Sequence, residues 1–362
     1  MQIPVRLGAR SYTIVVEPGS LAKLGDHLRP LGLGSKTALV SDAGIRARYG
    51  GPVTESLRTA GFSVVDIDVP AGESAKTLAV ASACWDALVD AKLDRAATVI
   101  ALGGGAVGDV AGFVAATFMR GMNFVQVPTT VLAQVDASIG GKTAIDHPRG
   151  KNMIGSFHQP RLVLVDPLTV VTLPDRDFRS GLAEIIKHGI VLDAAYFADL
   201  ERSIAAMLGR DPGTLERVIG GSCALKASVI ERDPEEKAEI RYTLNYGHTV
   251  GHAIEAVTGY DRFTHGEAVA LGIVAEAHLA RRIGLAAPET IARQEALLRA
   301  VGLPTRVTGL DPGRILDAMA RDKKARDGRV PIVLAPEIGS FRVVYDIGPD
   351  HVRGALSALE GA

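Results

Sequence analysis

The sequence predicts an α/β protein: a mainly parallel N-terminal α/β domain, residues 1–177, followed by a mostly helical C-terminal domain, residues 178–362. Two observations support this division. Through the first half of the chain, short β-branched runs alternate with helix-like stretches, a pattern typical of a parallel sheet covered by helices on both faces. Beyond Leu173 and Pro174, apolar residues instead recur at helical spacing up to about residue 319.

The first domain contains six predicted strands with helices between several of them. The strands are residues 12–16, 37–40, 63–69, 97–102, 124–127 and 162–165, and two of the helices are residues 79–91 and 109–119. Residues 97–102 are almost wholly apolar, as expected of a central parallel strand buried on both faces. In the second domain, two short apolar runs near the end, residues 330–334 and 341–345, predict a small hairpin.

Composition excludes several classes of function. The 362 residues carry 40 Lys and Arg against 41 Asp and Glu, so the net charge gives no electrostatic case for binding nucleic acid or an anionic membrane. No apolar stretch approaches the ~20 residues of a membrane span, and the first residues show no apolar core of a signal peptide. Only two cysteines occur, so no disulfide framework is expected, and we expect a cytoplasmic protein.

A glycine-rich turn follows the central predicted strand. Gly103, Gly105 and Gly108 satisfy the pattern G-x-G-x-x-G, in which glycines let the backbone approach a pyrophosphate at a helix N-terminus. An ordinary tight turn between strand and helix is the alternative. The acidic residue of a dinucleotide fingerprint, expected about 20 residues further on, is missing. A dinucleotide must therefore be held by other residues. The loop 70–76 also ends a strand, and its Glu73 and Lys76 are candidates for this contact.

A dense polar segment occupies residues 128–158. Its polar side chains lie among glycines and small residues: Thr129, Thr130, Asp136, Lys142, Lys151 and Asn152. Lys142 and Lys151 each follow a glycine, but the frame G-x-x-x-x-G-K-[ST] of a phosphate-binding P-loop is absent. Ammonium groups next to glycine turns suit an anionic ligand, so we favour an anion site over a solvated loop.

Potential metal ligands occur in three segments of the helical domain, at Glu184, at His248 and His252, and at His265. His248 and His252 are four residues apart and so share one helix face. Thr249 stands where the zinc peptidase motif H-E-x-x-H has its glutamate, which disfavours a metalloprotease. One carboxylate and two imidazoles leave an open coordination position, as in catalytic zinc sites. The spacing does not decide between His248 and His252.

Basic residues accompany these ligands in the sequence. They are Lys187, Lys226, Arg241, which is followed four residues later by Asn245, and the pair Lys323 and Lys324. Solvated charge is the ordinary explanation for each of them. A cluster of cations beside a metal and a dinucleotide would instead indicate a substrate with several negative charges.

Together these segments resemble the 3-dehydroquinate synthase family of sugar-phosphate cyclases. The resemblance runs in order over nearly the whole chain and is most specific in residues 103–121, 127–157, 181–189, 244–255 and 265–272. It implies a phosphorus–oxygen lyase of the shikimate pathway, which makes precursors of aromatic amino acids. The implied reaction converts 3-deoxy-D-arabino-heptulosonate 7-phosphate into 3-dehydroquinate and phosphate. It proceeds by transient NAD-dependent oxidation, phosphate elimination, reduction and intramolecular aldol closure.

The resemblance also implies cofactors and the residues that hold them. Zn²⁺ or Co²⁺ is expected at Glu184, His248 and His265. The positions implied for NAD are Asp42, Ala71, Gly72, Glu73, Ser74, Ala75, Lys76, Gly105, Ala106, Val107, Gly108, Asp109, Thr129, Thr130, Lys142, Lys151, Thr169, Val170, Val171 and Thr172. Ala71 and Ala75 depart from the Asp and Tyr that are usual in the family.

The implied substrate pocket is equally specific. His252 is assigned to proton transfer and substrate contact, and the other matching positions are Asp136, Lys142, Asn152, Lys187, Lys226, Glu236, Arg241, Asn245 and one of Lys323 and Lys324. The match of Glu236 is weakened by Pro234 and one extra residue before it. Arg120 matches an arginine that reaches the phosphate site of the neighbouring subunit, so the resemblance implies a homodimer.

Three other functions are weighed against this one. Another sugar-phosphate cyclase, making an inosose or a valiolone, would differ mainly in the substrate pocket. There, Arg241, Asn245, His252 and the segment 322–324 favour the carboxylate-bearing heptulosonate. A metal-dependent polyol or alcohol dehydrogenase would accumulate NADH. A non-catalytic protein that binds NAD and metal has no need of the proton-transferring His252.

Overall fold

The computed structural model describes residues 1–320, 330–345 and 347–360 of the chain. They form two compact units, residues 1–173 with 215–235, and residues 174–214 with the chain from 236 onward. The predicted boundary at residue 177 lies close to the end of the first stretch. Residues 215–235 differ from the prediction, which places them in the helical domain. They belong to helix α8 (Pro212–Arg232) and the residues after it, and the Cys223 thiol of α8 donates to the Gln134 carbonyl of the first unit at 3.3 Å.

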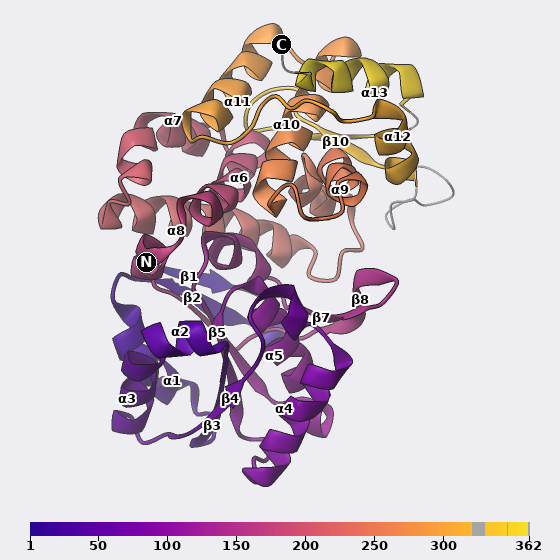
Figure 1. Cartoon of the computed structure of the whole chain (residues 1–362). Coiled ribbons are helices and arrows are strands. Elements are labelled where there is room, and N and C mark those ends of the chain that lie inside the picture. Colours follow the sequence, from indigo (N-terminus) through magenta and orange to yellow (C-terminus); the bar gives the residue numbers. More distant parts are fainter. Residues whose placement is uncertain (321–329, 346, 361–362) are drawn as a thin grey trace. The chain divides into compact units, whose positions relative to one another are not determined.

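The first unit is built on a seven-stranded sheet with the order β1-β2-β9-β6-β5-β3-β4 (Figure 1). Its strands are β1 (Gln2–Val5), β2 (Tyr12–Val16), β3 (Lys36–Ser41), β4 (Ser63–Asp68), β5 (Thr98–Gly103), β6 (Asn123–Pro128) and β9 (Leu162–Val165). All pairs are parallel except β1 with β2, which is antiparallel. The predicted mainly parallel α/β fold and its six strands are confirmed, and β1 is an addition.

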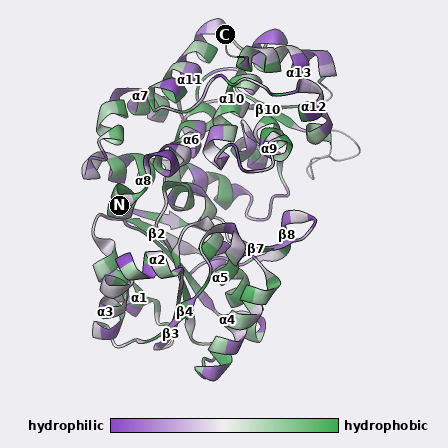
Figure 2. Ribbon diagram, in the orientation of Figure 1, coloured by the Kyte–Doolittle hydropathy of each residue, from purple (hydrophilic) through white to green (hydrophobic). Residues whose placement is uncertain are grey.

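The sheet is buried on both faces because neighbouring residues of its central strands serve opposite cores. On β5, Val99 packs into the core that contains Val110 and Leu88, whereas Ile100 packs into the core that contains Leu24 and Leu57. The first core lies against α4 (Leu78–Asp90) and α5 (Gly105–Thr117), and the second against α1 (Leu24–Leu28) and α3 (Gly51–Thr59). These helices carry both apolar and polar residues (Figure 2). Such a two-sided core explains why residues 97–102 read as a continuous apolar run.

The polar segment 128–158 contains a hairpin that the sequence did not predict. Strands β7 (Lys142–His147) and β8 (Gly150–Phe157) pair antiparallel, apart from the main sheet. Gly155 is required here, because a Cβ at this position would lie 2.0 Å from the Thr143 carbonyl oxygen across the hairpin. Glycine and polar residues conceal the two-residue periodicity by which strands are recognised.

The second unit is mostly helical, as predicted. Its helices are α6 (Asp175–Leu192), α7 (Ala194–Leu208), α9 (His248–Val257), α10 (His265–Arg282), α11 (Pro288–Ala300), α12 (Pro312–Ala320) and α13 (Pro349–Leu356). The predicted hairpin is present as β10 (Ile332–Leu334) and β11 (Arg342–Val344). Glycines let three helices meet at backbone distance: a Cβ on Gly266 would lie 1.9 Å from the Ser180 carbonyl oxygen, and one on Gly272 would lie 1.9 Å from that of Gly247. This packing brings α6, α9 and α10, the carriers of the predicted metal ligands, together.

Within the described residues, no helix combines the length and apolarity needed to cross a membrane. Cys84 and Cys223 are both buried and free. Burial raises the pKa of the Cys84 thiol to about 11 and that of Cys223 to about 12, so both thiols stay protonated at neutral pH.

Candidate functional site

The residues predicted to hold NAD follow the carboxyl ends of neighbouring strands in the first unit. Asp42 follows β3, the turn η5 (Gly72–Ala75) comes after β4, Gly105 begins the helix α5 after β5, and Thr129 follows β6. These strands are adjacent in the order β6-β5-β3-β4. In open α/β sheets, the crevice outside the carboxyl ends of the strands is where ligands bind. Strand order thus gathers segments that are nearly 90 residues apart in the sequence at one edge.

The glycine turn is closely packed at Gly103 and Gly108 and less closely at Gly105. A Cβ on Gly103 would lie 2.8 Å from the Val107 side chain, and one on Gly108 would lie 2.7 Å from that of Gln126. A Cβ on Gly105 would meet only Ala137, at 3.3 Å. Helix α5 has Gly104 as its N-cap and receives no capping hydrogen bond from it. Its first N–H groups and the positive end of its dipole therefore suit the pyrophosphate of a dinucleotide.

Lys76 joins three parts of the predicted NAD and substrate sets. Its side chain is 3% exposed, and Nζ donates to Asp109 Oδ2 of α5 at 2.8 Å and to Asn152 Oδ1 of β8. It also lies 3.6 Å from Glu73 Oε1. Burial lowers the pKa of Lys76, but Asp109, Glu73 and Asp146 raise it more, so the ammonium stays charged. Lys76 is therefore a charged, buried side chain that links the loop after β4 to α5 and to β8.

Asn152, Lys142 and Lys151 lie on the hairpin. Asn152 adopts a left-handed backbone conformation, φ 56°, and its N–H donates to Asp146 Oδ1 at 2.7 Å. Asparagine tolerates this conformation better than most residues. Lys142 and Lys151 are exposed on the hairpin strands, and Lys151 Nζ is 3.6 Å from Glu73 Oε1.

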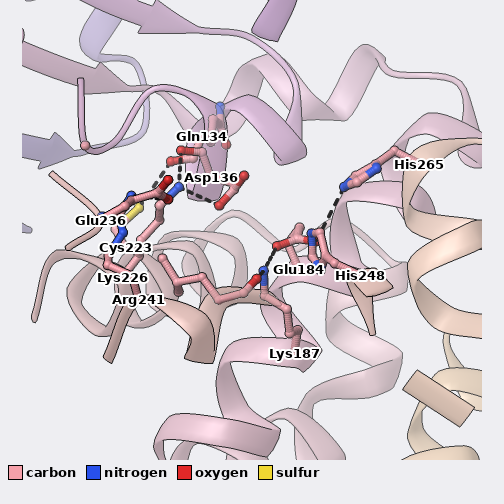
Figure 3. A network of polar contacts seen from close by, with 12 residues as sticks. Gln134, Asp136, Glu184, Lys187, Cys223, Lys226, Glu236, Arg241, His248 and His265 are labelled. Atoms are coloured by element: carbon pink, nitrogen blue, oxygen red, sulfur yellow. Dashed lines mark hydrogen bonds and ion pairs between the residues drawn. The ribbon is translucent and has the colours of Figure 1, made fainter. Parts of the chain in front are cut away.

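Asp136 and Lys226 form a pair within the first unit (Figure 3). Lys226 Nζ lies within hydrogen-bond distance of Asp136 Oδ1 and donates to the Asp136 carbonyl at 2.6 Å. The buried Gln134 amide fixes this turn, because Nε2 donates to the carbonyl of Asp166 and the hydroxyl of Thr169, both at 3.0 Å. The Asp136–Lys226 contact joins helix α8 to the turn after β6 within the first unit.

The predicted segment 169–172 lies in the 3₁₀ helix η8 (Pro167–Thr172) after β9. Tyr49, which was not predicted, orders this segment: the hydroxyl donates to the Thr169 carbonyl at 2.9 Å and lies 2.5 Å from Thr172 Oγ1.

Asp42, another residue of the predicted NAD set, caps the short helix α2 (Ala43–Ile45) by accepting the Ile45 N–H at 3.0 Å.

Three residues of the second unit gather as a possible metal set (Figure 3). Glu184 of α6 is fully buried, and its Oε1 lies 3.5 Å from His248 Nε2 of α9 and 3.8 Å from His265 Nε2 of α10. Two ligand atoms of a tetrahedral zinc ion, each about 2.1 Å from the metal, lie roughly 3.4 Å apart. Glu184 Oε1 has no hydrogen-bond partner among the described residues. A buried, unpartnered carboxylate oxygen facing two ring nitrogens fits a divalent cation.

Both imidazoles are oriented through their other nitrogen. His248 Nδ1 is 3.1 Å from the Tyr246 carbonyl oxygen, which it can approach only as a donor, so Nε2 is the nitrogen available to a metal. His265 Nδ1 is 3.5 Å from Glu255 Oε2. Partners of this kind are typical of metal-binding histidines. His248 is the histidine whose Nε2 lies 3.5 Å from Glu184 Oε1, whereas His252 forms a second possible metal set with Glu255 and His265.

The remaining predicted pocket residues of the second unit lie on nearby elements. His252 is half-buried with its ring centroid 5.2 Å from that of His248 and 5.9 Å from that of His265. Lys187 is buried, forms an ion pair with Glu184 and donates to the Leu244 carbonyl at 2.7 Å. That carbonyl belongs to the 3₁₀ helix η9 (Glu239–Asn245), which also carries Arg241 and Asn245, two residues predicted to line the pocket.

The Arg241 guanidinium is buried, and only part of its set of hydrogen-bond donors is satisfied by the described residues. Its Nη2 donates to Glu236 Oε1 at 3.1 Å, while Nε and Nη1 are buried and have no hydrogen-bond partner in the part of the chain that the structure describes. Glu236 itself is exposed, with φ 57°. The two predicted residues Lys323 and Lys324 lie outside the described residues.

Comparison with known proteins identifies the family of the chain. Models described as 3-dehydroquinate synthase N-terminal and C-terminal match residues 66–180 and 181–325. The chain belongs to the 3-dehydroquinate synthase family. Curated 3-dehydroquinate synthases from Geobacter metallireducens and Desulforamulus reducens are 49% and 47% identical to it, over 94% and 98% of this chain and 95% and 99% of theirs. The resemblance drawn from the sequence is confirmed.

Solved structures of sugar-phosphate cyclases share the fold of this 3-dehydroquinate synthase family member. A 2-epi-5-epi-valiolone synthase from Streptomyces hygroscopicus, solved with NAD⁺ and Zn²⁺, has a TM-score of 0.87 and 30% identity, covering 96% of each chain. A 2-deoxy-scyllo-inosose synthase solved with NAD⁺ and Co²⁺ has a TM-score of 0.88 and 24% identity, covering 98% of this chain and 99% of its own. At that identity, the second likeness shows the fold alone.

Two carboxylates that contact the elements of this possible metal set were not predicted from the sequence. Glu255 orients His265, and Glu276, fully buried on α10, accepts the N–H of Gly247 at 2.5 Å just before His248. The available signal was a single carboxylate within the apolar run 268–280. Such a residue is rarely buried without a partner.

Proposed function

We propose that the chain converts 3-deoxy-D-arabino-heptulosonate 7-phosphate into 3-dehydroquinate and phosphate, using NAD and a divalent metal ion, Zn²⁺ or Co²⁺. The observation that carries the proposal is the buried Glu184 carboxylate facing the Nε2 atoms of His248 and His265 in a 3-dehydroquinate synthase family member. In support of NAD, the glycine turn, η5 and Thr129 follow adjacent strand ends in the first unit. NAD supplies a reversible hydride acceptor, and the metal supplies Lewis-acid polarisation of substrate oxygens.

The chain's own residues bind and orient the substrate. We assign the C1 carboxylate to Arg241, whose two spare donors suit a charge-assisted contact with an anion. We assign the phosphate to Asn152, Lys142 and Lys151 on the hairpin, and proton transfer to His252 beside the metal set. A ketone at C5 acidifies the hydrogen at C6, so the phosphate leaves by elimination, and the later ring closure needs the same substrate held in place.

The reaction makes a clear demand on redox balance. We expect phosphate release from the heptulosonate phosphate to require both NAD and the metal, without net accumulation of NADH, because the hydride taken from C5 is returned to C5. The measurement is phosphate release together with the absorbance of reduced cofactor, with each cofactor omitted in turn.

The variant Arg241→Lys, which keeps the charge but not the planar fork, should mainly raise the KM for the substrate.

Two outcomes contradict the proposal. About one equivalent of NADH per turnover with a polyol would place the protein among dehydrogenases. Cyclisation of a sugar phosphate that lacks the carboxylate, at a rate equal to that of the heptulosonate, would place it among the inosose or valiolone synthases and would remove the role assigned to Arg241.

The proposal includes a cytoplasmic homodimer. Free, buried thiols at Cys84 and Cys223 are in keeping with a reducing compartment. Strand β8 is exposed over most of its length and presents Met153, 54% exposed, together with Ile154 and Phe157, 40% and 42% exposed. Apolar side chains gathered on an exposed strand indicate a protein contact. A second copy of the chain is the partner that the family implies.

Arg120 is assigned to the phosphate of the partner's substrate. Met119 and Arg120 both have positive φ, 46° and 64°, before Gly121, and Arg95 holds this strained turn by donating to the Met119 carbonyl from Nη2 at 2.9 Å. Arg120 itself is exposed. Strain of this kind persists where the surroundings enforce it, often at functional sites.

A shared site predicts complementation between inactive subunits. Mixing Arg120→Ala with Glu184→Ala protein should restore activity, because some sites of the mixed dimer combine an intact metal set with an intact arginine from the partner. The measurement is phosphate release after mixing, with subunit exchange followed by two affinity tags. Demonstrated exchange without recovered activity would show that Arg120 acts within its own chain or has no role in the reaction.

A further inference from the structure

Glu276 is a charged residue in an apolar environment. It lies in α10 within a run of buried residues from Ala268 to Ala277, and its side chain is fully buried. Burying a carboxylate is costly unless hydrogen bonds compensate it. The buried Glu276 carboxylate therefore needs hydrogen-bond partners, and these lie outside its own helix.

Those partners are the first N–H groups of helix α9. Glu276 Oε2 accepts the Gly247 N–H at 2.5 Å, and Oε1 accepts the Val250 N–H at 3.3 Å. The N-cap of α9 is Gly247, which has φ 78° and no side chain to cap the helix. Glu276 thus provides, from a neighbouring helix, the anionic cap that α9 cannot supply.

Helices α9 and α10 pack at backbone distance, which leaves Glu276 little room to move away from the start of α9. A Cβ on Gly272, one turn before Glu276, would lie 1.9 Å from the Gly247 carbonyl oxygen, and a Cβ on Gly251 would lie 3.0 Å from the Ala268 carbonyl oxygen. The start of α9 therefore rests on the backbone of α10, with Glu276 fixing its N–H groups.

This anchor lies directly beside a proposed metal ligand. His248 is the first residue of α9, and its Nδ1 is held by the carbonyl of Tyr246, the residue before Gly247. The Tyr246 hydroxyl in turn donates to Gln294 Oε1 at 2.6 Å, which secures the other side of the turn. His265 begins α10 itself. Glu276 consequently ties the helix that begins with one histidine ligand to the helix that begins with the other.

We propose that Glu276 is a positioning residue for the divalent metal: by capping α9 from within α10, it holds His248 Nε2 at the distance from Glu184 and His265 that the metal requires. This inference rests on the proposed function of the Glu184, His248 and His265 set. Outer partners of metal ligands commonly contribute roughly 10–100-fold to metal affinity.

The test compares Glu276→Gln with Glu295→Gln. Glutamine keeps the volume of Glu276, but its NH₂ group cannot accept an N–H, so one of the two caps is lost. Glu295 is a matched control: it is also a largely buried carboxylate of the second unit, on α11, and bonds His278 Nε2 at 2.6 Å rather than α9. Zn²⁺ affinity is measured by competition with a chromogenic chelator, and the unfolding midpoint of each metal-free variant is measured in parallel.

We expect Glu276→Gln to weaken Zn²⁺ binding by roughly 10–100-fold. Turnover should recover at saturating Zn²⁺ with little change in the substrate KM, and Glu295→Gln should bind Zn²⁺ as the unmodified protein does. Wild-type affinity in Glu276→Gln, or an equal loss in both variants, would overturn the proposal. If the glutamine variant does not fold, Glu276→Asp carries the test, since its shorter carboxylate should give an intermediate loss, and unchanged affinity would overturn the inference.

A Glu184→Gln sample separates this inference from the proposed function. If Glu184→Gln binds Zn²⁺ like the unmodified protein, the metal set itself is wrong. If Glu184→Gln loses the metal and Glu276→Gln does not, the metal set stands and the role of Glu276 is refuted.

Discussion

Glu184→Gln is expected to lose the bound metal and to lower turnover by at least about 1000-fold, equivalent to about 4 kcal/mol of transition-state stabilisation. The amide matches the carboxylate in shape, but it removes the negative charge that faces His248 and His265 at 3.5 and 3.8 Å. It also weakens the ion pair with Lys187, which retains its bond to the Leu244 carbonyl. Metal content and phosphate release measure the two effects.

The matched control for this variant is Glu201→Gln. Glu201 also belongs to the second unit and pairs with Arg293 at 2.7 Å, but this pair is partly exposed. It should leave metal content and turnover unchanged, since exposed ion pairs contribute little. NAD binding should persist in Glu184→Gln, because the predicted NAD residues belong to the first unit. Full metal content with normal turnover in Glu184→Gln would refute the proposed ligand set.

Lys76→Met is expected to destabilise the first unit by about 3–5 kcal/mol and to weaken NAD binding, because it leaves the Asp109 carboxylate, which is only 20% exposed, without its cation. Lys76 Nζ is 2.8 Å from Asp109 Oδ2, and burial already raises the pKa of Asp109 while Lys76 opposes that rise. Differential scanning calorimetry and NAD titration provide the measurements. Lys151→Met is the control for the change in stability alone, because Lys151 is 47% exposed and lies 3.6 Å from Glu73. It should cost at most about 1 kcal/mol of stability.

The effect of Lys76→Met should depend on pH with a definite sign. Without the lysine, the folded-state pKa of Asp109 rises further above its unfolded value. A carboxyl group with a raised pKa favours folding at low pH, and this contribution is lost as pH rises through the folded-state pKa. The deficit relative to the unmodified protein should therefore grow from about pH 4 toward neutrality. The double variant Lys76→Met, Asp109→Asn should recover part of the stability, and a deficit independent of pH would contradict this account.

Much of the fold followed from local pattern. The six predicted strands correspond to β2, β3, β4, β5, β6 and β9, because β-branched runs bounded by turns form strands wherever they can be buried. The hairpin of β7 and β8 was not predicted, since Gly155 and the polar residues around it carry no two-residue periodicity. The place of residues 215–235 was not predicted either, because helical spacing shows which face of a helix is apolar and not which core that face enters.

The candidate site likewise combines features that the sequence predicts with features that only the tertiary structure shows. By itself, the sequence determined the alternation of strands and helices, the glycine turn after the central strand, the carboxylate and imidazole types suited to a divalent metal, and the family. Only the tertiary structure decided that His248 faces Glu184, that Lys76 is enclosed by Asp109 and Asn152, and that Glu276 caps the helix of His248. These contacts join segments far apart in the chain. Their partners depend on strand order and on glycine-mediated helix packing, which no local pattern of residues encodes.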